Sequence, residues 1–381
     1  MFAFHSQQID RPYDGERVRR QAVANPNRLW NPKQAISYEV STNLDKSSVD
    51  AILAAIVFWS NNTCLRFVND SNATNRIRFF KGTGCWSYVG RIGGVQDVSI
   101  GQGCDTLSTT THELAHALGF EHTQSRVDRN ERVYIDFGNV LPSGVRNFKQ
   151  QSASENNNRN LPYDYGSVMH YSAYSYAVNP AKPTVYALDT RFQNSMGGRL
   201  PSFIDVNMMN ALYCSDACAL RSPSAKCQNG GYPDSATSCK TCKCPEGYGG
   251  ADCSTRDLSK CGNDISVGAT PLVWSAQVGD GNRTVSRLQY STCYWRFQAP
   301  PGSRIKVLVQ HVGYVCSSSC SYGGVELKLL ADKRMGGVRL CCDKDVKNGT
   351  AVFESANNEM MLVLYNRLYY TTVTLAYQRV V

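Results

Sequence analysis

Three histidines and one glutamate have the spacing that could hold a metal ion and use it. The pattern H-E-x-x-H-x-x-G-x-x-H runs from His112 to His122 and contains three of the six histidines in the chain. On a helix, His112 and His116 share one face, so their imidazoles can bind one ion. Gly119 can adopt a left-handed conformation that ends the helix, and His122 then becomes a third ligand. Three imidazoles and an open position predict a catalytic zinc, with Glu113 beside it as a base.

A helical histidine pair can also be a coincidence, and a feature further along the chain argues against that interpretation. Ser167–Tyr171 has the sequence S-V-M-H-Y. It fits the methionine turn that metzincin metallopeptidases place beneath their metal. A buried methionine is often only core packing. Together with the zinc motif, however, Met169 resembles the structural methionine of a metzincin.

Several segments resemble the astacin family, and the resemblance extends from about Leu29 to Cys214. Besides the zinc motif and the methionine turn, the matching segments are Ser125–Arg129, Cys85–Gly90 and Gln193–Gly197. The resemblance implies an α+β metzincin catalytic domain over residues 21–214. One position departs from it. Most astacins have a glutamate directly after the third histidine, where it contacts the new N-terminus, and here this position is Thr123.

The resemblance implies a secreted zinc endopeptidase that hydrolyses peptide bonds in extracellular proteins. Zinc lowers the pKa of a bound water to about 7, and Glu113 is expected to accept its proton as general base. Tyr171 is expected to bind zinc at rest and then to donate a hydrogen bond to the tetrahedral intermediate. The alternative is that Tyr171 is an ordinary packing residue. We expect the peptide to lie extended along a sheet edge at Val95–Ile100.

The composition predicts an extracellular protein of two or three domains. A chain of 381 residues exceeds one ordinary domain, and its sixteen cysteines favour disulfides in an oxidising compartment. No apolar run is long enough to span a membrane. The formal charge of +9 is scattered and accompanies no nucleic-acid motif. Candidate glycosylation sequons occur at Asn61, Asn69, Asn72, Asn282 and Asn348.

Residues 1–20 are interpreted as the end of a propeptide. Arg17–Arg20 has the sequence R-V-R-R, which resembles sites cut by furin-type convertases, so cleavage is expected after Arg20. The F-x-G-D motif that plugs the zinc in many astacin proforms is not found. The N-terminus also lacks the apolar core of a signal peptide, and we therefore expect the chain to be truncated upstream.

The elements that must position the zinc motif follow from periodicity. Strands are expected at 36–40, 77–80 and 98–100, and a helix is expected where apolar residues recur between Val49 and Trp59. A second helix carries His112, and a last one covers 204–213. The order predicts a small sheet backed by helices and then an irregular half. The resemblance pairs Cys64 with Cys214 and Cys85 with Cys104.

Residues 218–253 resemble an EGF-like module, too small to build a core without disulfides. The family pattern implies three bridges, Cys218–Cys239, Cys227–Cys242 and Cys244–Cys253. A zinc site at C-x-x-C is the rival interpretation.

Residues 261–381 have short alternating strands between turns and predict an all-β sandwich that resembles a CUB domain. By resemblance Cys261 pairs with Cys293. Cys316, Cys320, Cys341 and Cys342 could pair in three ways. The domain could bind a substrate or an extracellular protein partner, or serve as a spacer.

Two classes of function remain. The first is an active zinc endopeptidase. The alternative is a catalytically silent extracellular binding protein that uses its CUB-like and EGF-like modules. A silent relative usually loses a ligand or the base, whereas this chain keeps all of them.

Overall fold

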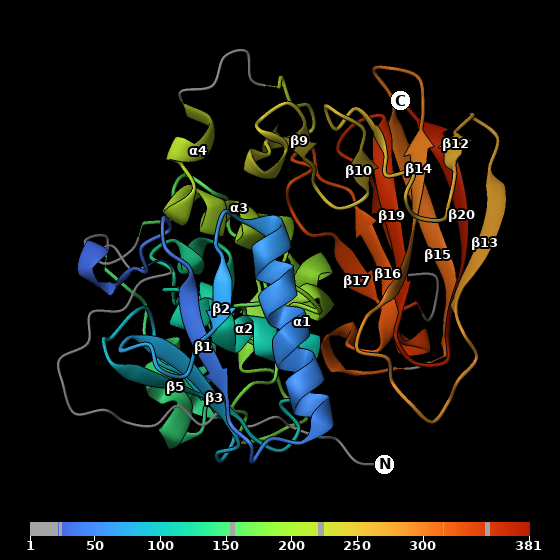
Figure 1. Cartoon of the computed structure of the whole chain (residues 1–381). Coiled ribbons are helices and arrows are strands. Elements are labelled where there is room, and N and C mark those ends of the chain that lie inside the picture. Colours follow the sequence, from blue (N-terminus) through green and yellow to red (C-terminus); the bar gives the residue numbers. More distant parts are fainter. Residues whose placement is uncertain (1–21, 23–24, 153–156, 220–224, 315, 347–350) are drawn as a thin grey trace. The chain divides into compact units, whose positions relative to one another are not determined.

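The computed structural model describes residue 22 and residues 25–152, 157–219, 225–314, 316–346 and 351–381 (Figure 1). The chain forms two compact units. The first contains residues 1–190 and 200–220, and the second contains residues 191–199 and 221–381. The expected propeptide, with the cleavage site at Arg20, lies outside the described residues. None of the described helices combines the length and the apolar character that crossing a membrane requires.

The first unit has a five-stranded sheet in the order β2-β1-β3-β5-β4. Its neighbouring strands are parallel, except that β4 is antiparallel to β5. The strand bounds are β1 Ile36–Val40, β2 Phe67–Asn69, β3 Arg76–Phe80, β4 Cys85–Ser87 and β5 Val95–Ile100. A separate antiparallel pair is formed by β6, Val133–Ile135, and β7, Val185–Ala187.

The expectation that β5 is the edge of this sheet is wrong. β4 pairs with it at Cys85↔Ile100, Trp86↔Ser99 and Ser87↔Val98. The short β4, with only three residues, therefore takes the edge position.

The described residues of the first unit form four α-helices: α1 Lys46–Asn62, α2 Leu107–Ala117, α3 Phe203–Tyr213 and α4 Asp216–Ala219. The Asp45 side chain caps α1 by accepting from Ser48 N. The buried face of α1 includes Trp59, whose indole donates to the carbonyl of Thr111 in α2 at 3.2 Å. This contact fixes the helix that carries the zinc motif against its neighbour.

The second unit contains a two-sheet sandwich preceded by a small disulfide-rich region. One sheet has the order β12-β14-β19-β16-β17 and the other β13-β20-β15-β18. Figure 1 shows these strands in colours from gold (β12 and β13) through orange to red. Their bounds are β12 Asp264–Ser266, β13 Leu272–Gly279, β14 Ser291–Gln298, β15 Arg304–Tyr314, β16 Gly323–Lys328, β17 Val338–Leu340, β18 Val352–Glu354, β19 Glu359–Asn366 and β20 Tyr370–Val380.

The small region between residues 225 and 256 has two short hairpins and little else. They are β8 Tyr232–Pro233 with β9 Cys242–Lys243, and β10 Tyr248–Gly249 with β11 Thr255–Arg256. The expected fold class is confirmed: an α+β unit, then a small disulfide-rich module, then a β-sandwich. The module boundaries at 21–214, 218–253 and 261–381 remain our proposal.

Disulfides tie each unit together. The first unit contains Cys64–Cys214 and Cys85–Cys104. The second contains Cys227–Cys242, Cys244–Cys253, Cys261–Cys293, Cys316–Cys342 and Cys320–Cys341. Cys218 and Cys239 are also disulfide-bonded, so the zinc alternative at Cys239-x-x-Cys242 is excluded. All sixteen cysteines are disulfide-bonded, as expected for a chain that folds in an oxidising compartment.

The residues Arg191–Arg199 pack into the second unit, although they lie between two parts of the first. Ser195 Oγ donates to the carbonyl of Gly337 at 2.9 Å and accepts from Arg339 N at 3.1 Å. The Arg199 guanidinium pairs with Glu246 and lies 4.3 Å from the ring centroid of Tyr365. Ser195 and Arg199 are both buried, so this segment is an integral part of the second unit.

Candidate metal centre

The helix α2 presents two histidines and a glutamate in the interior of the first unit. The Thr106 side chain caps its first turn by accepting from Thr109 N at 3.1 Å. His112, Glu113 and His116 are all buried, with exposed fractions of 6%, 1% and 4%. A histidine pair buried this deeply is not the solvated surface pair that coincidence would produce.

The chain turns after the helix as the glycine predicts. Gly119 has a φ of 101°, which only glycine adopts readily. Its N–H donates to the carbonyl of His116, and Phe120 N donates to that of Ala115. This ending satisfies the last helical carbonyls and brings His122 back toward the helix.

The three histidines converge on one point. Their ligand nitrogens all lie within 4.8 Å of one another, and Nε2 of His116 is 3.2 Å from Nε2 of His122. Nδ1 of His112 donates to the carbonyl of Val168, and Nδ1 of His116 donates to that of Phe120, each at 2.6 Å. Because these Nδ1 atoms carry the protons, the Nε2 atoms are the ones that can bind a metal.

The two helical histidines, His112 and His116, favour the neutral form that binds metals. Burial lowers the pKa of His112 to about 4. Burial and the neighbouring His112 lower the pKa of His116 to about 3. Three imidazoles, convergent and buried, fit a zinc ion that keeps one position open.

The methionine turn contacts the histidine cluster and the residue that follows it. Met169 is fully buried, and its carbonyl accepts from Thr123 N at 2.9 Å. The carbonyl of Val168, one residue earlier, orients His112. Tyr171 is 3% exposed. The centroid of its ring lies 4.4 Å from that of the His122 ring and 5.4 Å from that of the Phe148 ring. The structure therefore brings Tyr171 to the third histidine.

His170, although adjacent to Tyr171, is not among the clustered histidines. Its Nε2 bonds to the Tyr163 hydroxyl and its Nδ1 to the carbonyl of Tyr171, both at 2.6 Å. Burial lowers the pKa of His170 to about 4. It is a neutral structural residue of the turn.

Sequence reasoning missed two residues that support this centre, Gln124 and Asp205, and it named Ser167 only as the first residue of the methionine turn. The side-chain oxygen of Gln124 accepts from Tyr171 N at 3.0 Å. Asp205 accepts from Ser167 Oγ at 2.6 Å and from Val168 N at 2.8 Å. Burial raises the pKa of Asp205 to about 6. The capping box of α3, formed by Ser202 and Asp205, was visible as S-x-x-D, but it signals only a helix start.

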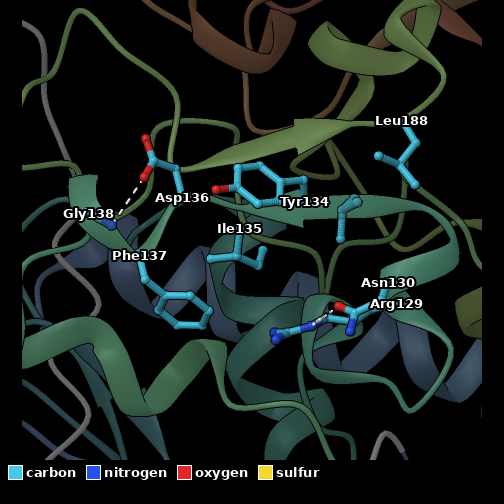
Figure 2. A pocket seen from close by; sticks show the side chains of 9 residues that line it. Arg129, Asn130, Tyr134, Ile135, Asp136, Phe137, Gly138 and Leu188 are labelled. Atoms are coloured by element: carbon cyan, nitrogen blue, oxygen red, sulfur yellow. Dashed lines mark hydrogen bonds between the residues drawn. The ribbon is translucent and has the colours of Figure 1, made fainter.

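A separate pocket of about 510 Å³ lies beside β6 and contains none of these residues. Figure 2 shows the rings of Tyr134 and Phe137 and the side chain of Leu188 around it. Its charged members are already bonded: Asp136 accepts from Gly138 N, and Arg129 donates to Asn130. It offers neither a nucleophile nor a ligand set, so the chemistry belongs to the histidine cluster.

Comparisons with known proteins agree with this site. The family model described as Astacin, a family of peptidases, matches residues 22–214. Three zinc metalloproteinases of Caenorhabditis elegans are similar over most of the chain. nas-31 is 39% identical over 368 residues, which is 96% of this chain and 59% of that protein. nas-28 is 37% identical, over 92% of this chain and 72% of that protein. nas-27 is 32% identical, over 96% of this chain and 88% of that protein.

One solved structure with a similar sequence is high choriolytic enzyme 1, a hatching enzyme zinc-protease from Oryzias latipes. It is 32% identical and covers 52% of this chain and 94% of its own, with a TM-score of 0.45.

Proposed function

Because this chain belongs to the astacin family of peptidases, we propose that it is a secreted zinc endopeptidase acting on extracellular proteins. One observation carries the proposal. His112, His116 and His122 place their ligand nitrogens within 4.8 Å of one another, and the next residue on the helix after His112 is Glu113. This arrangement supplies both a zinc site and a base. The alternative, a catalytically silent binding protein, would need neither a zinc site nor a base.

The residues of this chain divide the reaction between them. Zinc, when bound, supplies the Lewis acidity that acidifies water and polarises the scissile carbonyl. Glu113 accepts the proton of the attacking water and then delivers it to the leaving amine. The Tyr171 hydroxyl donates to the oxygen on which negative charge develops. Burial of both side chains excludes competing water and strengthens these interactions.

We propose that the substrate pairs with the edge strand β4. Its far side has no partner among the described strands, since the sheet ends there. A peptide laid in extended form along Cys85–Ser87 would use the free backbone groups of that edge. The Cys85–Cys104 bridge connects this strand to the segment just before α2, and so stiffens the connection between the edge and the helix that carries the histidines.

Metal removal tests the proposal. We expect the purified chain to cleave an unstructured protein such as casein, to lose this activity with a zinc chelator and to regain it when zinc is restored. Mapping the cleaved bonds in a peptide library would define the preference around the scissile bond. Activity that survives complete zinc removal would contradict the proposal.

Activation is expected to follow cleavage after Arg20, leaving Gln21 as the new N-terminus. Ala22, the first described residue, supports this assignment, because it is 1% exposed and forms an antiparallel bridge with Phe120. Ala22, two residues after Arg20, is therefore packed into the expected catalytic domain. N-terminal sequencing of the secreted active form should begin at Gln21. An active form that retains residues 1–20 would contradict the assignment.

The exposed sequons support a secreted glycoprotein. Asn61, Asn69, Asn72 and Asn282 are exposed, whereas Asn348 lies outside the described residues.

We propose that the CUB-like sandwich contacts an extracellular partner or substrate. The alternative is that this domain serves only as a spacer.

A further inference from the structure

The third histidine lies outside α2, so helical geometry alone does not fix its position. The helix ends at Ala117, and the chain reverses at Gly119 before it reaches His122. The following 3-10 helix, Thr123–Ser125, has only three residues. An element this short provides few internal hydrogen bonds. The placement of His122 therefore depends on tertiary contacts, both its own with Tyr171 and those of its neighbours.

Thr123 supplies two such contacts, and both reach the methionine turn. Its N–H donates to the carbonyl of Met169 at 2.9 Å. Its hydroxyl donates to Ser167 Oγ, also at 2.9 Å. The side chain is fully buried. The residue next to His122 is thus bonded to the turn through both its backbone and its side chain.

Ser167 carries the connection onward to Asp205. Ser167 Oγ donates to Asp205 Oδ1 at 2.6 Å and accepts from Met169 N at 3.0 Å, as well as from Thr123. Its one donor and two acceptor sites are all used. Asp205 Oδ2 accepts from Val168 N at 2.8 Å and from Ser202 N at 2.8 Å, which ties the turn to the start of α3.

We infer that Thr123, Ser167 and Asp205 form a hydrogen-bond relay that positions His122 for zinc, with Thr123 as the member next to that histidine. The inference rests on the proposed function, since it concerns the same metal centre. A carboxylate at position 123 would bring a charge into a fully buried site that already holds Asp205. The short neutral hydroxyl instead completes an internal chain of hydrogen bonds. His122 is thereby coupled to the turn whose Val168 carbonyl orients His112.

The variant Thr123→Val tests the relay, because it keeps the shape of the side chain and removes only the hydroxyl. Removing a residue that orients a metal ligand typically costs about 10–100-fold in metal affinity. Since Thr123 acts through the adjacent backbone, we expect a rise in the zinc dissociation constant at the lower end, about tenfold. The measurement is competition with a chromogenic chelator on the full chain. Thr123→Ser should restore the parental affinity.

Thr184→Val is the matched control. Thr184 is also fully buried, and its hydroxyl donates to the carbonyls of Ala173 and Ser175, with no bond to the histidine segment. It should lose stability to urea as Thr123→Val does, yet keep its zinc affinity. An equal loss of zinc affinity in both variants would contradict the inference, because it would show that Thr123 only stabilises the fold.

Ser167→Ala interrupts the relay from its other side and covers the case that Thr123→Val does not fold. Its zinc affinity should fall at least as far as that of Thr123→Val. The double variant should lose no more zinc affinity than the single variant with the larger loss, because the relay acts as a unit. Parental affinity in either folded single variant, or additive losses, would overturn the inference. Failure of the parent itself to bind zinc would instead refute the proposed function.

Discussion

Glu113→Ala should abolish peptide hydrolysis while leaving the fold and the zinc in place. Glu113 lies on α2 next to His112, but the histidine nitrogens form the ligand cluster without it. A general base typically contributes about 10²–10⁴-fold. The loss in kcat should reach at least this range, since the leaving amine depends on the same proton. The measurement is peptide turnover at saturating substrate, with zinc content determined on the same sample.

Glu131→Ala is the control for this experiment, because Glu131 is exposed and belongs to the short 3-10 helix Arg129–Glu131. Its turnover should equal that of the parent. A Glu113→Ala protein with full zinc and near-parental turnover would exclude Glu113 as the base.

Tyr171→Phe should reduce kcat by about 10²–10³-fold, the usual cost of one oxyanion donor. The substitution keeps the ring that packs 4.4 Å from His122 and 5.4 Å from Phe148, and removes only the hydroxyl. Because that hydroxyl acts mainly in the transition state, KM should change little. Steady-state kinetics on a peptide substrate separates the two constants, and zinc content should remain parental.

Tyr176→Phe tests whether the aromatic packing matters instead. The Tyr176 ring lies 5.7 Å from that of Tyr171 and 6.3 Å from that of Phe148. It should keep its turnover. Unchanged kcat in Tyr171→Phe at full zinc occupancy would exclude the catalytic role of its hydroxyl.

The zinc motif could be interpreted from sequence because it is local. Helical periodicity placed His112 and His116 together, and Gly119 could be assigned to the turn, which has a φ of 101°. Asp205 could not be found in this way, since it meets Ser167 across 38 residues and only the folded chain brings them together. β4 was missed because three residues carry too little alternation to predict a strand.

For the cysteines too, some pairings could be expected from the sequence and others only from the folded chain. The resemblance implied partners for most of them, but Cys316, Cys320, Cys341 and Cys342 allowed three pairings. The structure joins Cys316 to Cys342 and Cys320 to Cys341. That choice depends on how the chain segments before β16 and after β17 come together in space, which spacing along the sequence does not reveal.

The packing of Arg191–Arg199 gives this protein an unusual connectivity. The chain passes between the two compact units three times, after residues 190, 199 and 220. A single cut between 220 and 225 would therefore sever the backbone without releasing the two fragments, even after Cys218 and Cys239 are reduced. The amino-terminal fragment would still contribute Ser195 and Arg199 to the other, through Gly337, Arg339 and Glu246. Because Cys218 and Cys239 lie on opposite sides of the cut and are disulfide-bonded, the test needs a reductant. Such a nicked molecule would separate on a reducing, denaturing gel and migrate as one particle in native buffer that contains the same reductant. It would be a complementing pair of fragments.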